Sequence, residues 1–455
     1  MNKRIASIDA LRGIAICLMI LSSAIGWGAG LPAWMFHCQC PPPTYAFNFA
    51  VKGITWVDLV FPWFLFSMGA AIPFSLGSKL RRGESLGRIS WGLVKRWFTL
   101  AAFGLVLGNS YIIADYQSWS ACLVRFGIWV GLFLALWRVQ RAHSWALNAL
   151  GALVVIAMLC VEKFVLGANL GLHNIDIIIM VMSLVALLGG FSWLLTRKNI
   201  WLRLALIALV FITKEVNWHT HALDVLAFPE WIDWLFRWSY VQYLLVVLTG
   251  TIIGDILMAA DGEICETPRE SRSAAAAWLC VLMIPLALWG FFTRNVWILF
   301  TAVFALGGLA MWLTREDKSA WSIIMRIGFA ALQFGIIFDP IDGGITKDHA
   351  NISYMLSTTG LACLLTSFLL WSEARAALKG HTLSRALTMT GQNPMVAYTV
   401  TGFVIMPLLY LCRFDLFDQL TIGNPALGFL RGVIITSIMV ALTCLFTGRR
   451  IFWRS

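Results

Sequence analysis

The segment Leu59–Leu76 reads LVFPWFLFSMGAAIPFSL and contains no charged side chain. An α-helix rises about 1.5 Å per residue, so roughly 20 apolar residues cross the hydrocarbon layer of a bilayer. Inside that layer every backbone N–H and C=O group needs a partner within the protein, and a helix provides these partners. The segment therefore predicts a membrane-spanning helix.

Thirteen further apolar runs recur along the 455 residues. They are Gly13–Trp27, Phe98–Ile113, Cys122–Trp137, Trp145–Cys160, Ile177–Leu195, Leu202–Thr213, Tyr243–Ala259, Ala274–Phe292, Val296–Leu313, Trp321–Phe338, Tyr354–Trp371, Met395–Leu411 and Val433–Phe446. Hydrophobic residues make up 60% of the chain and charged residues only 13%, about half the usual share in soluble domains. We predict an all-α, polytopic integral membrane bundle. The short Leu202–Thr213 run and the closely spaced Ala274–Leu313 pair leave the count at about 12–14 transmembrane helices.

Basic residues indicate the orientation of these helices. Lys and Arg favour cytoplasmic loops, and placing the N-terminus inside puts most of the 34 basic residues there. We therefore expect both termini to be cytoplasmic. The net charge of +11 is spread over many short loops, which argues against nucleic-acid binding. Lys3 and Arg4 leave a signal peptide as an alternative for the first run, although Asp9 and Arg12 lie unusually close to it.

The longest polar inner loop, Asp261–Ser273, suggests a division of the chain. We expect an N-terminal transmembrane bundle over residues 1–260 and a C-terminal bundle over residues 274–455. The sequence is compatible with a homo-oligomer.

Two polar clusters are candidate sites, because polar groups within a membrane are costly and often functional. The first is Asp9 and Arg12 at the inner end of the first run. One interpretation is an ion pair that anchors the helix, and the other is a cationic site for a cytosolic phosphate-bearing ligand. Asn393, which precedes Pro394 where another run begins, is either a structural helix start or part of the same site.

The second cluster lies on the outer side, where His37 occupies a proline-rich loop and Asp58 begins the next run. A carboxylate beside a histidine fixes its tautomer and raises its basicity, so this pair could act as a general base. A surface histidine and a metal site with Cys38 and Cys40 are the alternatives, although that spacing matches no usual zinc pattern. Asp58 could instead be a helix cap, or it could pair with Arg125.

Several motifs resemble the heparan-α-glucosaminide N-acetyltransferase family and its bacterial relatives among the transmembrane acyltransferases. They are Ile8–Ala15, Gly53–Trp63 with the pattern Gly-x-Thr-x-x-Asp-Leu-Val-Phe-Pro-Trp, Leu123–Gly127, Gly250–Asp255, Gly343–Asp348 and Gly391–Met395. The block at Gly53–Trp63 is specific, whereas the Asp-x-Leu-Arg-Gly start is shared by several acyltransferase families. The related polysaccharide O-acyltransferases carry a histidine where this chain has Ser23.

The resemblance implies an acyl-CoA-dependent acyltransferase that moves an acetyl group from cytosolic acetyl-CoA to an extracytoplasmic carbohydrate, an amino sugar. It implies no metal, and it implies a location in the inner (plasma) membrane of a bacterium. A transporter or flippase for a sugar or a lipid-linked glycan is the alternative. In the family's lysosomal members the catalytic histidine lies five residues before the motif glycine, and Asn48 occupies that position here.

We therefore expect His37 to replace that histidine, with Asp58 as its partner. We further expect acceptor binding by Asn48, Arg125, Lys347 and Asp348, and acyl-CoA binding by Asp9, Arg12 and Asn393.

Overall fold

The computed structural model describes residues 5–111, 118–137, 144–220, 229–260 and 271–453, which form helices and connecting loops without a β-strand. The longer helices are α1 (Ala6–Ala24), α2 (Trp56–Arg81), α3 (Leu86–Ser110), α4 (Trp119–Leu136), α5 (Ser144–Phe164), α6 (Ile177–Thr196), α7 (Ile200–Thr220), α10 (Leu244–Ala259), α11 (Ser271–Phe292), α12 (Val296–Leu313), α13 (Ala320–Ile341), α14 (Ile352–Leu378) and α19 (Pro425–Gly448). The short helices are η1 (Ala33–Met35), α8 (Glu230–Asp233), α9 (Trp238–Val241), α15 (Arg385–Gln392), α16 (Pro394–Val400), the π-helical η3 (Thr401–Ile405), α17 (Met406–Leu411) and α18 (Asp415–Thr421).

Twelve spans within the described part of the chain are long and apolar enough to cross a membrane. The predicted all-helical membrane bundle of 12–14 spans is thus confirmed at its lower count. The two predicted runs that fall outside this set lie in α3 and α7. Both helices carry charged side chains among their apolar residues, Lys95 and Arg96 in α3 and Arg203, Lys214 and Glu215 in α7.

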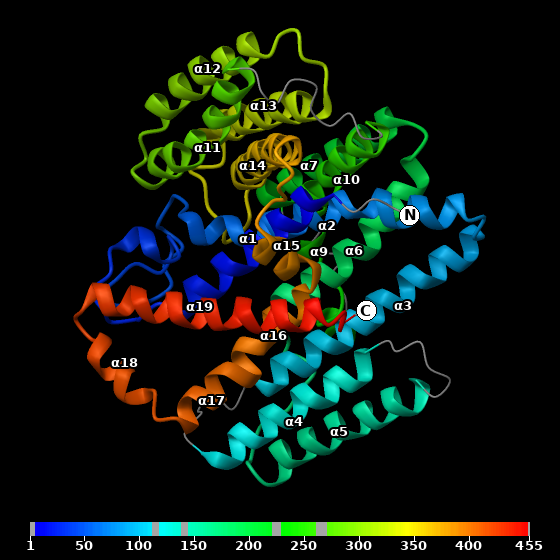
Figure 1. The fold of residues 1–455 in the computed structure, drawn as a ribbon, viewed down its shortest axis with the longest axis vertical. Helices are drawn as coiled ribbons and strands as arrows, with labels where there is room; N and C mark the ends of the chain where they lie inside the picture. Colours follow the sequence, from blue (N-terminus) through cyan, green and yellow to red (C-terminus); the bar gives the residue numbers. More distant parts are fainter. Residues whose placement is uncertain (1–4, 112–117, 138–143, 221–228, 261–270, 454–455) are drawn as a thin grey trace.

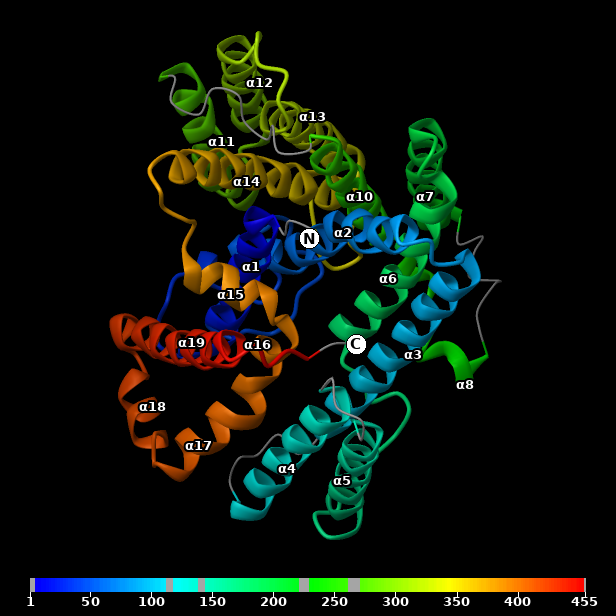
Figure 2. The same ribbon diagram turned by 45° about the vertical axis from the view of Figure 1, so that its right-hand side comes forward.

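Close helix contacts through glycine build the centre of the molecule. A side chain on Gly69 of α2 would meet the carbonyl of Val247 at 2.3 Å, and one on Gly250 of α10 would meet the carbonyl of Phe66 at 2.4 Å. Small residues let membrane helices approach this closely. Figures 1 and 2 show α11–α13 at one end of the long axis and α4 and α5 at the other, with α1, α2 and α14 between them.

Helices from both predicted halves pack against each other. α14, α15 and α19 contact α1, and α14 also contacts α2. The division near residues 261–273 stays a prediction, and residues 261–270 lie outside those described. Any site at the ends of α1 or α2 can therefore draw side chains from distant parts of the sequence.

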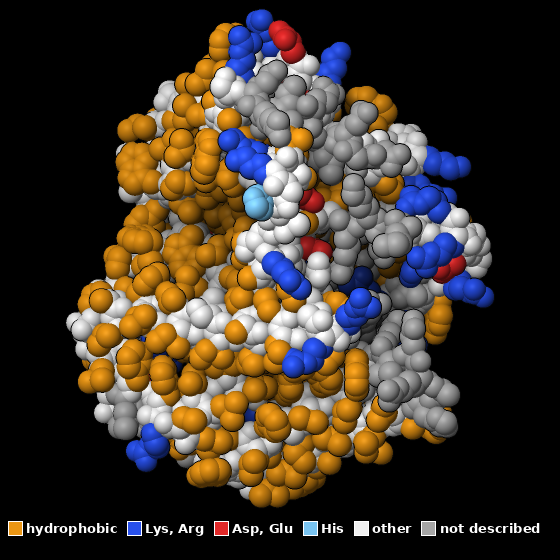
Figure 3. Space-filling model, viewed as in Figure 1, with side chains coloured by type: hydrophobic (Ala, Val, Ile, Leu, Met, Phe, Trp, Pro, Cys, Tyr) orange, Lys and Arg blue, Asp and Glu red, His pale blue; other side chains and the backbone are white. Residues whose placement is uncertain are grey.

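The surface is that of a protein surrounded by lipid. Large side chains such as Trp297 and Phe164 are 82% and 78% exposed. Figure 3 shows a broad hydrophobic face, with Lys and Arg gathered toward the side where α2 ends and α3 begins. The loop between α2 and α3 lies on this side (Figure 1). We expect this loop to be cytoplasmic, and the orientation of the termini stays a prediction.

Candidate active site

The start of α2 places Asp58 in two roles at once. Thr55 caps the helix, and its backbone N–H donates to Asp58 Oδ2 over 2.8 Å, so the two residues form a capping box. The other carboxylate oxygen, Oδ1, lies 2.7 Å from His37 Nδ1. The helix-cap interpretation and the histidine-partner interpretation of Asp58 are therefore both correct, each for a different oxygen. The Asp58 side chain is fully buried, and that of His37 is 22% exposed.

Hydrogen bonds fold the loop before α2 back onto the helix start. The hydroxyl of Thr55 donates to the carbonyl of Phe36 over 2.7 Å, which fixes the backbone next to His37. The buried amide of Gln39 donates to the carbonyls of Val51 and Gly53 over 3.2 and 3.3 Å. The loop thus curls around Gln39, and His37 reaches Asp58 although 21 positions separate them in the sequence.

A second loop, from Gly344 to Ala350 between α13 and α14, brings Lys347 to the same place. The N–H of Gly53 donates to the carbonyl of Ile345 over 2.8 Å, so the two loops are joined through their backbones. Lys347 Nζ contacts His37 Nε2 directly. An ammonium group can only donate, so Nε2 accepts from it and the ring hydrogen resides on Nδ1, where it faces Asp58.

The carboxylate of Asp339 supports this second loop from beneath. It accepts hydrogen bonds from both terminal nitrogens of Arg294, at 2.8 and 2.6 Å, and from the N–H of Ile345 over 2.7 Å. The hydroxyl of Tyr354 on α14 donates to the carbonyl of Asp58 over 2.7 Å. Our sequence analysis did not identify these supporting residues, because a carboxylate or tyrosine near the end of an apolar run usually lies at the membrane interface.

The thiols of the two cysteines in the first loop are weaker acids than an ordinary cysteine thiol. Burial and the nearby Asp58 raise the pKa of Cys38 to about 12, and burial together with Asp348 raises the pKa of Cys40. Both thiols are therefore protonated near neutral pH, and neither is an activated nucleophile. Within the described ranges no three His, Cys, Asp or Glu side chains are grouped to hold a metal ion.

The other predicted acceptor-side residues differ in position. Asp348 follows Lys347, and its buried Oδ2 has no hydrogen-bond partner among the described residues. Asn48 is exposed and accepts from the N–H of Ala50 over 2.9 Å. Arg125 lies on α4, which packs mainly against α5, so the alternative Asp58–Arg125 pairing is wrong. The charged side chains that act on Asp58 are His37 and Lys347.

The inner cluster forms structural contacts. Arg12 lies 3.4 Å from Asp9 Oδ1, and its guanidinium also donates to the carbonyls of Gly391 and Ser67, at 3.2 Å each. The amide of Asn393 donates to the carbonyl of Ile451 over 2.8 Å and so holds the C-terminal segment. These contacts explain Asp9 and Arg12 as anchors that join α1, α2 and α15, and Asn393 as an anchor of the C-terminal segment. Their role in acyl-CoA binding stays a prediction.

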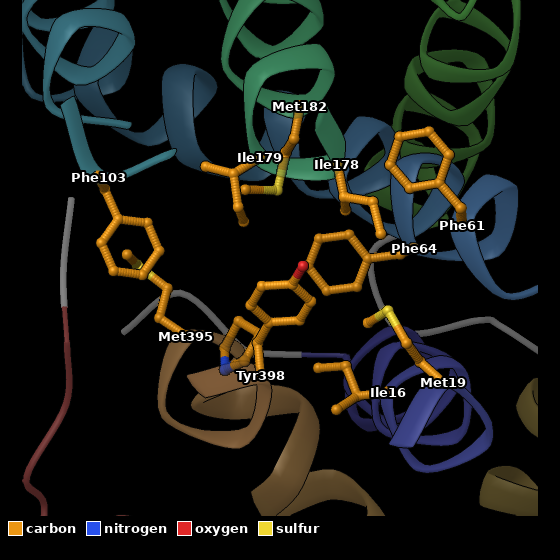
Figure 4. Close-up of a pocket in the computed structure, with 11 residues that line it drawn as sticks. Ile16, Met19, Phe61, Phe64, Phe103, Ile178, Ile179, Met182, Met395 and Tyr398 are labelled. Atoms are coloured by element: carbon orange, nitrogen blue, oxygen red, sulfur yellow. The ribbon is translucent and has the colours of Figure 1, made fainter. Parts of the chain in front are cut away.

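A narrow apolar cavity lies between α1, α2, α3, α6 and α16. Figure 4 shows its lining, with aromatic rings and methionines around Tyr398. It adjoins a wider cleft, and the two share Met19, Ile178 and Tyr398. The Tyr398 hydroxyl donates to Asp176 Oδ2 over 2.7 Å. The cavity can accept a slender apolar group.

Comparisons with known proteins give a family and two relatives. A family model described as "Domain of unknown function (DUF5009)" matches residues 4–257, more than half of the chain. The chain is similar to the heparan-alpha-glucosaminide N-acetyltransferase of Homo sapiens, with 36% identity over 120 residues, and to that of Mus musculus, with 34% identity over 120 residues. The aligned segment covers 26% of this chain and only 15% and 16% of the two relatives.

Proposed function

We propose that this chain, which belongs to the family described as Domain of unknown function (DUF5009), is a membrane acyltransferase that uses acyl-CoA to acylate an extracytoplasmic carbohydrate amine. The observation that carries the proposal is the contact of His37 Nδ1 with the buried Asp58, which leaves Nε2 as the basic atom. The similarity to two N-acetyltransferases supports the reaction type. Acetyl-CoA is the donor that this similarity favours.

The geometry suits general base catalysis. A protonated amine must give up a proton before its nitrogen can attack a thioester carbonyl, and Nε2 of His37 can accept that proton. Asp58 holds the ring by Nδ1 and stabilises the imidazolium that forms. Such proton transfer typically contributes about 10²–10⁴-fold to the rate. Asp58 is itself fixed through Thr55, so the base is held in one orientation.

Measuring CoA release tests this proposal against a transporter. Purified protein in detergent is mixed with acetyl-CoA, with and without glucosamine, and free thiol is measured. We expect CoA release that depends on glucosamine and gives N-acetylglucosamine. A transporter or flippase, which the cleft beside η3 would also suit, gives no thioester cleavage under these conditions. Absence of cleavage with any acyl-CoA would refute the proposal.

Sidedness needs a separate experiment, because Cys38 is buried and its thiol has a high pKa. The exposed positions Thr44 and Arg82 are suitable instead. Each is changed to Cys after the exposed Cys160 and Cys412 have been replaced by Ser. We expect a membrane-impermeant thiol reagent to label Thr44→Cys in intact cells and to label Arg82→Cys only after lysis. The reverse pattern would invert the topology and place His37 inside.

A further inference from the structure

We propose that Lys347 occupies the position of the acceptor's amine in the resting protein, so that it blocks His37 until an ammonium-bearing acceptor displaces it. The inference rests on the proposed function and names the reacting group of the acceptor as a protonated amine rather than a hydroxyl. The observation that supports the inference is the contact of Lys347 Nζ with His37 Nε2, the atom that has to accept the substrate's proton.

The first step of the argument is steric. A base and the group that it deprotonates lie about 2.6–3.2 Å apart at the moment of transfer. Lys347 Nζ already fills that space beside Nε2, and Asp58 fills the corresponding space beside Nδ1. An acceptor nitrogen and Lys347 Nζ cannot both contact Nε2, so the lysine has to leave. Its side chain is long, flexible and only half-buried, which allows this movement.

The second step is electrostatic. The carboxylates of Asp58 and Asp348 lie close to the lysine, and the buried Oδ2 of Asp348 has no hydrogen-bond partner among the described residues. Two negative groups favour a cation at this position over a neutral one. A substrate ammonium can therefore replace the lysine ammonium with little electrostatic loss, whereas a sugar hydroxyl replaces it poorly.

The chemistry balances with this exchange. The substrate ammonium R–NH₃⁺ transfers one proton to His37 Nε2 and becomes a free amine. Its nitrogen attacks the thioester carbonyl, a C–N bond forms, and the C–S bond breaks. The imidazolium returns its proton to the CoA thiolate, and the second ammonium proton is released to solvent. The products are R–NH–CO–CH₃, CoA–SH and H⁺, and Lys347 can return to Nε2.

Chemical modification of His37 tests the blockade without any turnover. Diethyl pyrocarbonate acylates an unprotonated, accessible imidazole nitrogen, and mass spectrometry of peptides reports His37 separately from the other histidines. At pH 8 we expect Lys347→Met to react about tenfold faster at His37 than the unchanged protein, a ratio typical of one lost charged hydrogen bond. Lys347→Arg keeps a charged donor and should stay within about twofold of the unchanged protein. Equal rates in all three proteins would refute the blockade.

Kinetics with acetyl-CoA and glucosamine test the exchange. We expect Lys347→Met to lower the KM for glucosamine about fivefold or more while kcat changes less than about threefold, because a competing cation is gone. Lys347→Arg should not lower KM. A merely structural lysine would leave KM unchanged, and a lysine that takes part in the reaction would lose kcat in the Met variant; either result overturns the proposal. If the unchanged protein cleaves no thioester, the proposed function fails, whereas the modification experiment still decides whether Lys347 blocks His37.

Discussion

The start of α2, which we expect on the outer side, and the start of α1, which we expect on the inner side, each hold a buried aspartate beside a basic side chain, yet the partners differ. At the outer end, Asp58 faces His37, which in turn faces Lys347, so side chains that exchange protons contact one another. At the inner end, Arg12 donates to backbone carbonyls of α2 and α15. A carbonyl cannot change its charge, so the inner contacts join helices, whereas the outer contacts can carry chemistry. The partner of a buried charged side chain therefore indicates its role, structural or chemical, better than its burial does.

The largest effect is expected at His37. His37→Ala removes the base, and we expect turnover of acetyl-CoA to fall about 10²–10⁴-fold while acetyl-CoA binding and the unfolding temperature stay near their original values. Asn48→Ala is the matched control, because Asn48 holds the position of the family's histidine but is exposed, and its side chain accepts from the N–H of Ala50. For both variants, calorimetric titration measures the binding of acetyl-CoA and CoA release measures turnover. If the Asn48 variant loses turnover and the His37 variant keeps it, the assignment of the base is wrong.

The next largest effect concerns stability at the inner end. A side chain on Gly391 would lie 1.8 Å from the carbonyl oxygen of Asp9, so α15 and α1 would have to move apart. We expect Gly391→Ala to cost about 3 kcal/mol of unfolding free energy, visible as a lower unfolding temperature. Gly308→Ala on α12 meets no atom within 4 Å and should be neutral or slightly stabilising. Equal stability of the two variants would show that the inner contacts are dispensable.

Arg12 separates the two interpretations of the inner cluster. Arg12→Met removes the hydrogen bonds to Gly391 and Ser67, and we expect a loss of about 1–3 kcal/mol in unfolding free energy. If Arg12 serves only as an anchor, its donors are already used and acetyl-CoA affinity should change less than about threefold, whereas the predicted role in acyl-CoA binding requires a larger loss. A tenfold loss of affinity in a variant of unchanged stability would instead establish Arg12 as part of the donor site.

The fold and the His37–Asp58 pair of the outer site follow from local sequence. The approach of Lys347 to that pair does not. Apolar runs predict helices by length alone, and the pairing of His37 with Asp58 follows from an unpaired carboxylate near a single loop histidine. The approach of Lys347 depends on backbone pairing between Gly53 and Ile345, which are almost 300 positions apart, and on the Arg294–Asp339 pair beneath. No local pattern encodes such long-range pairing, so only the resemblance of Gly343–Asp348 pointed to this loop.

The smallest expected effect concerns two carboxylates near the end of α13, which differ in their partners. Asp339 is paired with Arg294, whereas Asp342 accepts one hydrogen bond from the N–H of Ser353 over 2.7 Å. Burial, reinforced by Glu215 and Asp339, raises the pKa of Asp342 to about 6 against the opposing effects of Ser353 and Lys214. Folding therefore favours the protonated form of the Asp342 carboxyl over the ionised form. Below about pH 4 this carboxyl costs no stability, and the cost grows as the pH rises to about 6 and then stays constant.

Asp342→Asn isolates that cost, because the amide keeps a carbonyl oxygen for Ser353 and carries no charge at any pH. We expect the variant to gain about 1 kcal/mol over the unchanged protein at pH 7.5 and little or nothing at pH 4.5. Unfolding temperatures in detergent at the two pH values measure the difference, with the exposed Glu316→Gln as a control that should show no such gain. A gain of equal size at both pH values would mean that the variant acts through packing. A gain at pH 7.5 alone would show that the ionised carboxylate of Asp342 lowers the stability of the outer region. At the inner end, by contrast, the hydrogen bonds of Arg12 to backbone carbonyls stabilise the protein.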